Sequence, residues 1–499
     1  MKETAFVRTL AFAAVFTAFN IATTGTGLAP DQAGAPGGPE RSAEARIARV
    51  ENGLLPGIVI SGRPSPAAAI AARMAALHVP GVSVAVIDGG EVAWAKGYGA
   101  LVAGSAAPVT PETLFQAASI SKSVAALGAL RLVERGVLSL DEDVNARLVS
   151  WKVPENEFTK TEKVTLRRLL SHTAGLTVSG FGGYAAGDAV PTVVQVLDGV
   201  KPANSAAVRV EAVPGGRWSY SGGGFTIMQL LMTEATGKPF PELMAELVLK
   251  PLGMTASTYE QPLPEPRRAA AAAAHGPDGK PIPGHSHTYP EMAAAGLWTT
   301  PSDLARFLVE IQNAVAGRSS VLSAATAKLM TTVVKEGYGL GLMLQRLGPA
   351  ASFGHGGSNE GFKCLMTAYL ANGRGAVVMT NADRGLRIAS EVLRAVAQEY
   401  DWPSQKPQVK TTVEVPPAAL AALAGRYEMS PGHVLTVALE GSALVARDGD
   451  ERIELYPESE TRFFELVEET TVVFFKGPDG RPTHLLIDNR IKAPRLIDK

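Results

Sequence analysis

The chain has 499 residues, of which 46% are hydrophobic and 19% are charged. This length exceeds what one hydrophobic core usually organises, so we expect one large and one small domain, and the composition excludes a mainly disordered protein. The 47 lysine and arginine residues nearly balance the 48 aspartate and glutamate residues. This balance excludes a net field that would attract nucleic acid or an anionic membrane, and it favours a small neutral molecule or a peptide as substrate.

Residues 1–36 have the pattern of a secretory signal peptide followed by a flexible leader. Lys2 and Arg8 precede an apolar run over residues 10–22, and small residues follow. The run is shorter than the ~20 residues that span a bilayer, so a retained membrane anchor is the weaker interpretation. The single cysteine, Cys364, excludes an internal disulfide and lies far from the signal, where a lipid would attach. We expect a periplasmic or secreted protein without a stable membrane anchor.

Residues 42–402 alternate strand and helix signals. Two apolar runs, 82–87 and 91–98, flank an Asp-Gly-Gly turn. This pattern predicts a β-hairpin, because such residues supply the positive φ angles of tight turns. Helical spacing then predicts a helix over 119–135, closed by Gly136 as a left-handed C-cap.

The middle of this region is predicted to be mostly helical, and its end returns to strands. Two further helices are expected over 225–235 and 302–314, the second capped by Ser302. The strand-like runs that follow cover residues 338–344, 364–370 and 375–380. Because strands come from both ends of the region, the order predicts an α/β domain whose sheet combines them.

The last part of the chain is predicted to be a separate all-β unit. Residues 403–417 contain four prolines and few apolar residues, which is linker composition. Residues 418–499 then alternate short apolar runs with turn signals. The clearest runs cover residues 434–437, 452–456, 462–467 and 471–475.

Ser119 and Lys122 form an S-x-x-K pair at the start of the first predicted helix. Three residues apart, they share one helix face, so the amine can reach the hydroxyl. A serine hydroxyl needs such a neighbour to lose its proton as it attacks a carbonyl, and the helix start adds N–H groups suited to the developing negative charge. Alone the motif is weak evidence, because an exposed lysine on a helix is usually a solvated charge.

Two later segments add to the pair. Residues 218–224 place Tyr220 in a glycine-rich turn before a helix, and residues 353–358 place His355 among glycines that let a substrate approach the backbone. With these segments, residues 42–400 resemble class C β-lactamases and their low-molecular-weight penicillin-binding relatives. The supporting matches are Leu169–Leu176, Pro251–Met254 and Ala294–Leu304.

The resemblance implies a β-lactamase/DD-peptidase-like fold, an antiparallel sheet flanked by helices with a helical subdomain. It implies a serine hydrolase without metal or organic cofactor. Ser119 would become acylated, Lys122 and Tyr220 would share its proton, and Tyr220 would later help to activate the deacylating water. His355 would replace the family's usual lysine. Because a tyrosine with a pKa near ~10 is a poor base, Lys122 and a charged or hydrogen-bonding His355 must lower the cost of deprotonation.

The same resemblance implies an oxyanion hole. Its donors would be the backbone N–H groups of Ser119 and Ser358, the latter on an edge strand that also carries Gly357 toward the substrate. Asn359 and Glu360, just beyond, either contact substrate or shape the turn.

Two departures from the family pattern bear on substrate choice. The chain has Tyr220-Ser221-Gly222 where the β-lactamases have Tyr-x-Asn, so it lacks the amide that would hold an acylamino group. It has His355-Gly356-Gly357 where they have Lys-Thr-Gly, as in relatives that cleave D-amino-acid peptides or esters. The expected substrates are β-lactams, D-amino-acid amides or peptides, and esters. The alternative is a penicillin-binding or sensor protein that is acylated but turns over poorly.

Other histidines carry less weight. His172 lies in a structural stretch of the family and is expected to be buried with its hydrogen bonds satisfied. His285 and His287 lie in a loop without a third ligand, so no metal site is predicted. Tyr289 is expected to line the substrate cleft, and His355, with an ordinary pKa of about 6.5, to make activity vary between about pH 5.5 and 8.

The C-terminal unit resembles small lipocalin-like β-barrels appended to some members of this family. One hypothesis is a packing module or the site of homo-oligomer formation. The other is that one of its loops narrows the mouth of the active site.

Overall fold

The computed structural model describes residues 42–64, 67–345, 348–449, 451–466 and 469–496, and it contains two compact units. The larger unit holds the described residues up to Glu51 and Ala69–Ser404; the smaller holds Asn52–Ala68 and Gln405 onward. Within these ranges no helix combines the length and the apolar character needed to cross a membrane. The predicted signal peptide and leader lie outside the described residues.

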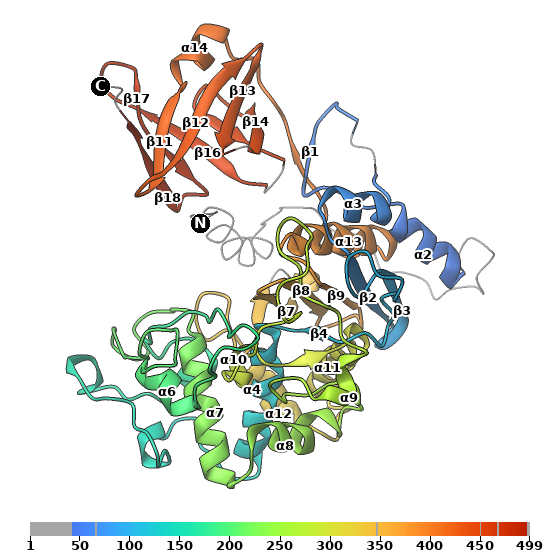
Figure 1. Ribbon diagram of the computed structural model, residues 1–499, viewed down its shortest axis with the longest axis vertical. Helices are drawn as coiled ribbons and strands as arrows, with labels where there is room; N and C mark the ends of the chain where they lie inside the picture. Colours follow the sequence, from blue (N-terminus) through green and yellow to red (C-terminus); the bar gives the residue numbers. More distant parts are fainter. Residues whose placement is uncertain (1–41, 65–66, 346–347, 450, 467–468, 497–499) are drawn as a thin grey trace. The chain divides into compact units, whose positions relative to one another are not determined.

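A six-stranded sheet forms the centre of the larger unit, in the order β3-β2-β9-β8-β7-β6 (Figure 1). Its strands are β2 (Gly81–Asp88), β3 (Glu91–Gly99), β6 (Met343–Gln345), β7 (Ser352–Asn359), β8 (Phe362–Tyr369) and β9 (Gly375–Thr380). Every neighbouring pair is antiparallel. The predicted hairpin, β2 and β3, lies beside β9, with Val84 opposite Val378. The prediction that the sheet combines strands from both ends of the region is therefore confirmed.

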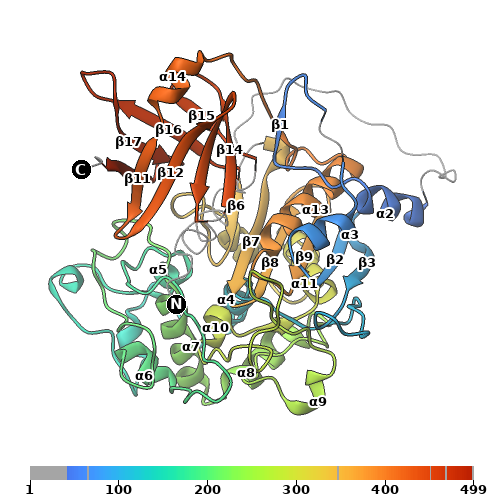
Figure 2. The ribbon, with the colours of Figure 1, turned by 45° about the horizontal axis from the view of Figure 1, so that its top comes forward.

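Helices pack against this sheet because its central strands are apolar along their whole length. All residues of β8 and β9 are buried. Helix α13 (Gly385–Glu399) packs on β8 and β9, as Figure 2 shows, and α11 (Pro301–Val315) packs on β2 and β9. Helix α11 begins one residue before the predicted start, because the Thr300 side chain, rather than that of Ser302, accepts the N–H of Asp303 as the cap.

The helical part contains the elements that carry the candidate site. Helix α4 (Ile120–Glu134) is apolar on nearly all sides and is therefore buried in the core. Helix α7 (Gly222–Thr236) starts three residues before the predicted start, with Ser221 as its cap and Gly237 as its left-handed end. The short strands β4 (Phe115–Gln116) and β5 (Trp298–Thr299) pair with each other. The other helices are α2 (Ala43–Glu51), α3 (Ile70–Ala76), α5 (Leu166–Leu170), α6 (Val193–Asp198), α8 (Phe240–Met244), α9 (Glu265–Arg268), α10 (Met292–Ala295) and α12 (Ala324–Met330).

The predicted strand over 338–344 is wrong for most of its length. Only Met343 to Gln345 form a strand, because the preceding residues turn: the Gly339 N–H donates to Leu342 and Gly341 has a φ of +80°. Helix α13 was not among the expected helices. Residues 353–358 are part of the regular strand β7, in agreement with the strand that the resemblance implies at Ser358.

The smaller unit contains a closed barrel of eight antiparallel strands, as the barrel-like expectation for residues 418–499 predicts. Its strands are β11 (Gly425–Ser430), β12 (His433–Glu440), β13 (Ala443–Asp448), β14 (Glu451–Pro457), β15 (Arg462–Phe464), β16 (Thr471–Lys476), β17 (Pro482–Ile487) and β18 (Ile491–Leu496). Side chains such as Tyr427, Phe463 and Phe474 fill its interior. The barrel follows helix α14 (Pro417–Ala422).

A short parallel pair belongs to the same unit. Strand β1 (Ile58–Ile60) pairs with β10 (Gln408–Lys410), and the Gly57 N–H donates to the Glu469 carboxylate at 2.7 Å. The sequence boundaries assigned β1 to the catalytic region and β10 to the linker. The two segments are instead joined by a ladder, which sequence patterns of three residues do not reveal.

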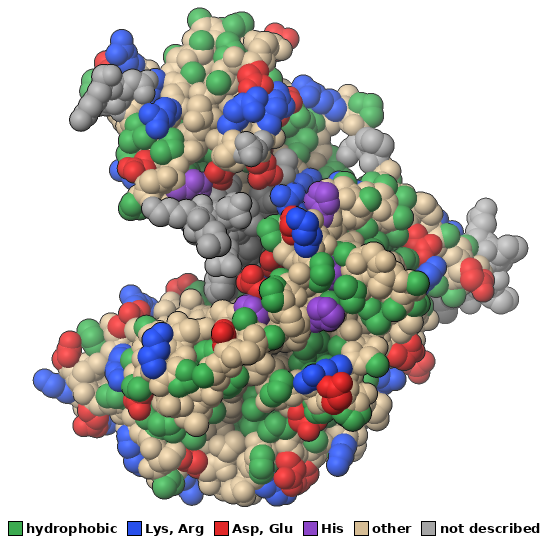
Figure 3. Space-filling model, in the orientation of Figure 1, with side chains coloured by type: hydrophobic (Ala, Val, Ile, Leu, Met, Phe, Trp, Pro, Cys, Tyr) green, Lys and Arg blue, Asp and Glu red, His purple; other side chains and the backbone are tan. Residues whose placement is uncertain are grey.

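Charged side chains are interspersed on the surface. The face in Figure 3 shows lysine and arginine beside aspartate and glutamate, without a large area of one sign. This distribution agrees with the near-zero net charge.

We expect the ion pair between α3 and α13 to stabilise the larger unit. The Arg73 guanidinium binds both carboxylate oxygens of buried Glu391, at 2.6 and 2.7 Å. Removing one partner of a buried pair leaves a charge unpaired, so Glu391→Ala should lower the free energy of unfolding by about 3 kcal/mol. Tryptophan fluorescence during urea unfolding measures it, because all five tryptophans precede residue 403, in the larger unit.

Glu399→Ala is the matched control on the same helix. Its two partners, Arg46 and Arg49, are partly exposed, at 27% and 48%, so the loss should be about 1 kcal/mol or less. Equal losses in the two variants would contradict the assigned role of the Arg73 pair.

Candidate active site

Ser119 lies at a sharp turn between β4 and α4. Ala118, the residue before it, has a φ of +49°, a left-handed conformation that costs a non-glycine residue about 1 kcal/mol or more. The turn is fixed by two hydrogen bonds, from Ile120 N–H to Ala117 and from Ser121 N–H to Ala118. Ser119 therefore precedes the first helical residue, and its half-buried side chain sits at the positive end of the helix dipole.

The Lys122 amine is buried beside the serine. Its Nζ donates to Ser119 Oγ at 3.0 Å and to the Ala294 carbonyl at 2.7 Å. Only 2% of the side chain is exposed, and this burial lowers the pKa of Lys122 to about 7. About half of the amines are thus neutral near pH 7, and a neutral amine can accept the serine proton.

Tyr220 meets the same hydroxyl from the turn before α7. Its side chain is hydrogen-bonded to Ser119, and Lys122 Nζ lies 5.1 Å from the centre of its ring. Burial raises the pKa of Tyr220 above its usual value, so the group is a phenol at neutral pH. Ser119, Lys122 and Tyr220, which the sequence separates by up to about a hundred residues, therefore converge on one oxygen atom.

His172 holds the turn that carries Tyr220. Its carbonyl accepts from Ser219 N–H at 2.8 Å, and its Nδ1 accepts from Ser221 N–H at 3.0 Å. Its ring lies 4.2 Å from that of Tyr220, and burial lowers its pKa well below the usual value. The expected structural role agrees with these contacts, but Nε2 has no hydrogen-bond partner among the described residues, so only one nitrogen is satisfied.

His355 is a buried neutral imidazole. Nδ1 donates to the Gly356 carbonyl at 2.6 Å, and Nε2 accepts from the Tyr338 hydroxyl at 3.0 Å. Burial, opposed by the Gly356 bond, lowers the pKa of His355 to about 3. The expected titration of His355 between pH 5.5 and 8 therefore does not follow from its surroundings. Its ring centre lies 6.2 Å from that of Tyr220.

Tyr338 is a site residue that the sequence did not indicate. It is 1% exposed, and its ring contacts those of His172 and Trp218 as well as His355. An aromatic residue at the start of a predicted strand is usually a core residue, so nothing in the sequence distinguished Tyr338 from ordinary core residues.

Strand β7 passes close to the serine because it carries a glycine there. A Cβ on Gly357 would lie 2.2 Å from the Ala117 carbonyl oxygen and 2.4 Å from Cys364 Sγ. Any larger residue would force β7 away from the turn before Ser119.

The backbone of Ser358 is suited to an oxyanion. Asn359 pairs with Phe362 across a two-residue turn, so these two exchange hydrogen bonds and the next pair, Ser358 with Lys363, does not. The Ser358 N–H therefore points away from β8. Strand β6 pairs only as far as Gly354, so β7 is an edge at Ser358, although it is not an edge along its whole length.

The turn after Tyr220 leaves little room for a side chain at Gly222. A Cβ on Gly222 would lie 3.0 Å from the Phe181 ring and 3.1 Å from the Ser179 carbonyl. The missing asparagine of the β-lactamase pattern is thus accompanied by an aromatic ring beside the position.

The remaining sequence candidates lie outside the reacting group. Tyr289, expected to line a cleft, is fully buried, and its hydroxyl accepts from Glu360 N–H at 3.2 Å. Asn359 is also buried, and its side chain binds Gln116 and Ala295, so it shapes the structure. Exposed His285 and half-buried His287 belong to no cluster of three metal-ligand side chains within the described ranges.

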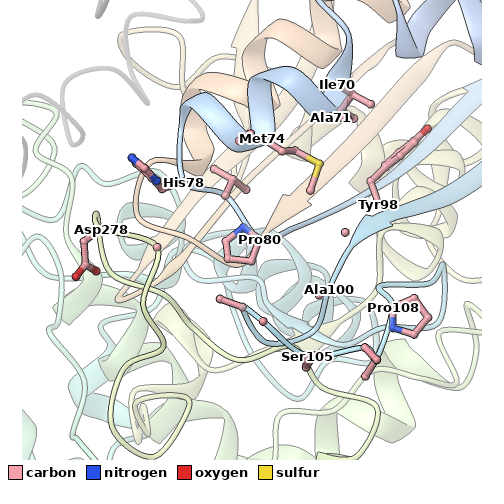
Figure 4. A pocket seen from close by; sticks show the side chains of 18 residues that line it. Ile70, Ala71, Met74, His78, Pro80, Tyr98, Ala100, Ser105, Pro108 and Asp278 are labelled. Carbon is pink, nitrogen blue, oxygen red and sulfur yellow. The ribbon is translucent and has the colours of Figure 1, made fainter.

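A separate cavity of ≈ 750 Å³ lies elsewhere in the larger unit (Figure 4). It is bounded by Met74 of α3, by Pro80 and Tyr98, and by small residues of the 103–108 loop. No candidate catalytic residue lines it.

Comparison with known proteins agrees with this geometry. The family model described as Beta-lactamase matches residues 67–400. The chain belongs to the beta-lactamase family. It is a serine hydrolase of the kind that includes the penicillin-binding proteins. A penicillin-binding protein of Bacillus subtilis (strain 168) is 24% identical over 431 residues, which are 82% of this chain and 92% of that protein.

Solved structures show the same fold. The octameric penicillin-binding protein homologue from Pyrococcus abyssi has a TM-score of 0.59 at 24% identity, over 85% of this chain and 98% of its own. The D-amino acid amidase from Ochrobactrum anthropi SV3, complexed with L-phenylalanine amide, has a TM-score of 0.52 at 22% identity, over 66% of this chain and 97% of its own.

We expect Gly357→Ala to inactivate the site without unfolding the chain. The added methyl group must displace β7 from the serine turn, and misplacement by about 1 Å can cost about 10²-fold in kcat. Ester hydrolysis and circular dichroism measure the two properties. Gly276→Ala is the control, since its Cβ would meet nothing closer than 3.4 Å. Unchanged kcat in Gly357→Ala would refute the close approach.

Proposed function

We propose that the protein hydrolyses amide or ester bonds through a covalent acyl-enzyme on Ser119. The observation that carries this proposal is the buried Lys122 amine, 3.0 Å from Ser119 Oγ, with a pKa of about 7. A buried lysine with a lowered pKa beside a serine at a helix start has few structural explanations and is suited to a base.

In acylation, neutral Lys122 takes the Ser119 proton while Oγ attacks the substrate carbonyl. The N–H groups of Ser119 and Ser358 stabilise the negative charge on the carbonyl oxygen, and such donors contribute about 10²–10³-fold each. The proton then passes through Lys122 or the Tyr220 phenol to the leaving group as the scissile bond breaks. Tyr220 relays a proton in this scheme, in agreement with its raised pKa.

In deacylation, a water molecule replaces the leaving group and returns a proton by the same route. As water attacks the acyl carbon, its proton passes through the Tyr220 phenol to the neutral Lys122 amine. The acyl–Oγ bond then breaks, and the proton held by Lys122 moves to Ser119 Oγ, which is released as a hydroxyl together with the acid product. Neutral His355, held by Tyr338, packs behind Tyr220 and keeps its ring in place without adding a charge.

The substrate class we favour is amides, peptides and esters of D-amino acids, rather than β-lactams. Gly222 and the ring of Phe181 stand where an amide would hold the acylamino group of a β-lactam. The similarity to a D-amino acid amidase supports this choice. The second candidate is a protein that is acylated and released slowly, supported by the similarity to a penicillin-binding protein.

We also propose export and self-association. Export rests on the sequence of residues 1–36. Self-association rests on the likeness to an octameric homologue, and light scattering of the full mature chain measures it.

The central test compares wild type with Ser119→Ala on D-alanine p-nitroanilide, a p-nitrophenyl ester and a chromogenic cephalosporin. We expect Ser119-dependent continuous release from the first two, because the amine and the oxyanion donors serve any acyl group. Intact mass during turnover detects the acyl-enzyme. A single burst with a stable adduct would favour the slow binder, and equal release by both proteins would remove Ser119 from the mechanism.

The pH profile should follow Lys122. Below its pKa of about 7 the amine is protonated and cannot accept the serine proton. kcat/KM should therefore rise about tenfold from pH 6 to pH 8, with a midpoint near 7. His355→Gln keeps this position neutral and should lower the rate without moving the midpoint. Loss of the pH dependence in His355→Gln would identify His355 as the titrating group instead.

A further inference from the structure

The side chain of Asn359 joins three segments of the candidate site. It directly follows Ser358, the proposed oxyanion donor, and is 4% exposed. Its Nδ2 donates to Gln116 Oε1 at 2.8 Å and to the Ala295 carbonyl at 3.1 Å. Both hydrogens of the amide are thus used inside the protein, each toward a different element.

Each partner is adjacent to a part of the proposed machinery. Gln116 ends β4, three residues before Ser119, and is 1% exposed. Its own Nε2 donates to the His287 carbonyl at 2.7 Å. Ala295 ends α10 and follows Ala294, whose carbonyl accepts the Lys122 amine.

We propose that Asn359 and Gln116 are positioning residues that set the distance between the two oxyanion donors and hold the carbonyl that orients Lys122. The inference rests on the proposed function, since it concerns the same reaction. Neither amide forms a hydrogen bond with Ser119, so their effect reaches the reaction through the backbone of Ser358 and through α10.

The energetics support this assignment. No β-sheet hydrogen bond joins β7 to β4, because β4 pairs with β5 in a separate sheet. Truncating Asn359 would leave the Gln116 oxygen and the Ala295 carbonyl buried without this donor. Because unsatisfied buried acceptors are costly, the segments that carry them should shift to find other donors. The β7–β8 turn has an independent support: Lys363 Nζ binds the Asn359 carbonyl at 2.8 Å and Asp383 at 2.6 Å. Strand β7 should therefore survive the truncation while its distance from Ser119 changes.

The test measures kcat and KM of the full chain with a p-nitrophenyl ester. Asn359→Ala should lower kcat by about 10²-fold and change KM by less than about threefold, because binding is kept and alignment is lost. Asn359→Asp has the same shape but no side-chain N–H, so its kcat should be lowered by a similar factor. If Asn359→Asp retains the wild-type kcat, donation is not the function of this side chain.

A double-mutant cycle tests whether the two amides act as one unit. The kcat of the Gln116→Ala/Asn359→Ala double variant should be no lower than that of the worse single variant, because the effects of residues in one network are not additive. If the loss of kcat in the double variant equals the product of the two single losses, the two amides act independently and the proposal is overturned. Gln116→Glu keeps the oxygen that accepts from Asn359, so its loss of kcat should be smaller than that of Gln116→Ala. This comparison with wild type serves as the test if the alanine variants fail to fold.

Gln312→Ala is the matched control for a purely structural effect. Gln312 is another buried amide that donates to two carbonyls, of Tyr369 at 2.8 Å and Arg374 at 3.0 Å. It should lower the Tm about as much as Asn359→Ala while leaving kcat and the pH midpoint unchanged. In Asn359→Ala the midpoint should move upward, because a loosened α10 lets water reach Lys122. Identical kinetics in the two variants would overturn the proposal.

The wild type and Ser119→Ala are run first, so that two failures are separable. No Ser119-dependent release in the wild type overturns the proposed function and the inference with it. Ser119-dependent release together with a wild-type kcat in Asn359→Ala overturns the inference alone.

Discussion

The burial of the Lys122 amine is the constraint on which the rest of the site depends. An ammonium group in an apolar core is costly, and the cost is reduced here by two acceptors and by a pKa lowered to about 7. The two acceptors lie on different elements, Ser119 at the start of α4 and Ala294 in α10. The amine therefore holds the helix that carries the nucleophile against a second segment, and its protonation state is linked to the packing of both.

Burying that amine requires a helix that is apolar on nearly every side. The residues of α4 from Ile120 to Leu130 are buried, so half-buried Ser119 stands at the end of a helix that is enclosed by the core. The left-handed Ala118 then turns the chain so that β4 leads directly into the helix. A glycine on β7 allows the second oxyanion strand to approach the same turn. Each of these features would be a defect elsewhere, and together they bring two backbone N–H groups to one reacting atom.

Regular elements with a strong period could be predicted from the sequence, and elements defined by tertiary contact could not. The hairpin β2–β3 and the strand β9 follow alternating or continuous apolar runs between clear turn signals. Strand β7 carries three glycines, so its composition alone does not indicate a strand; the family resemblance implies one at Ser358, and the structure shows it paired with β8. Strands β1 and β10 have three residues each and exist because they meet.

The site shows the same division. Ser119, Lys122 and Tyr220 could be predicted because motif and resemblance name them, and the hydrogen bonds join them. Tyr338 and Gln116 could not, because a buried tyrosine or amide gives no signal until its partner is known. Asn359 was a candidate, but the sequence left open whether it contacts substrate or shapes the turn.

His355 shows why the identity of a residue does not determine its charge. Because His355 stands where the family has a lysine, the sequence suggests a cation at this position that titrates near neutral pH. In the structure burial keeps the ring neutral: Nδ1 donates to the Gly356 carbonyl, and the neutral ring then accepts the Tyr338 hydroxyl at Nε2. A second cation close to Lys122 would raise the cost of both, so with His355 neutral, Lys122 is the titrating base that contacts Ser119 near pH 7. Replacing the family's lysine by histidine therefore removes a charge from the surroundings of Tyr220 and Lys122.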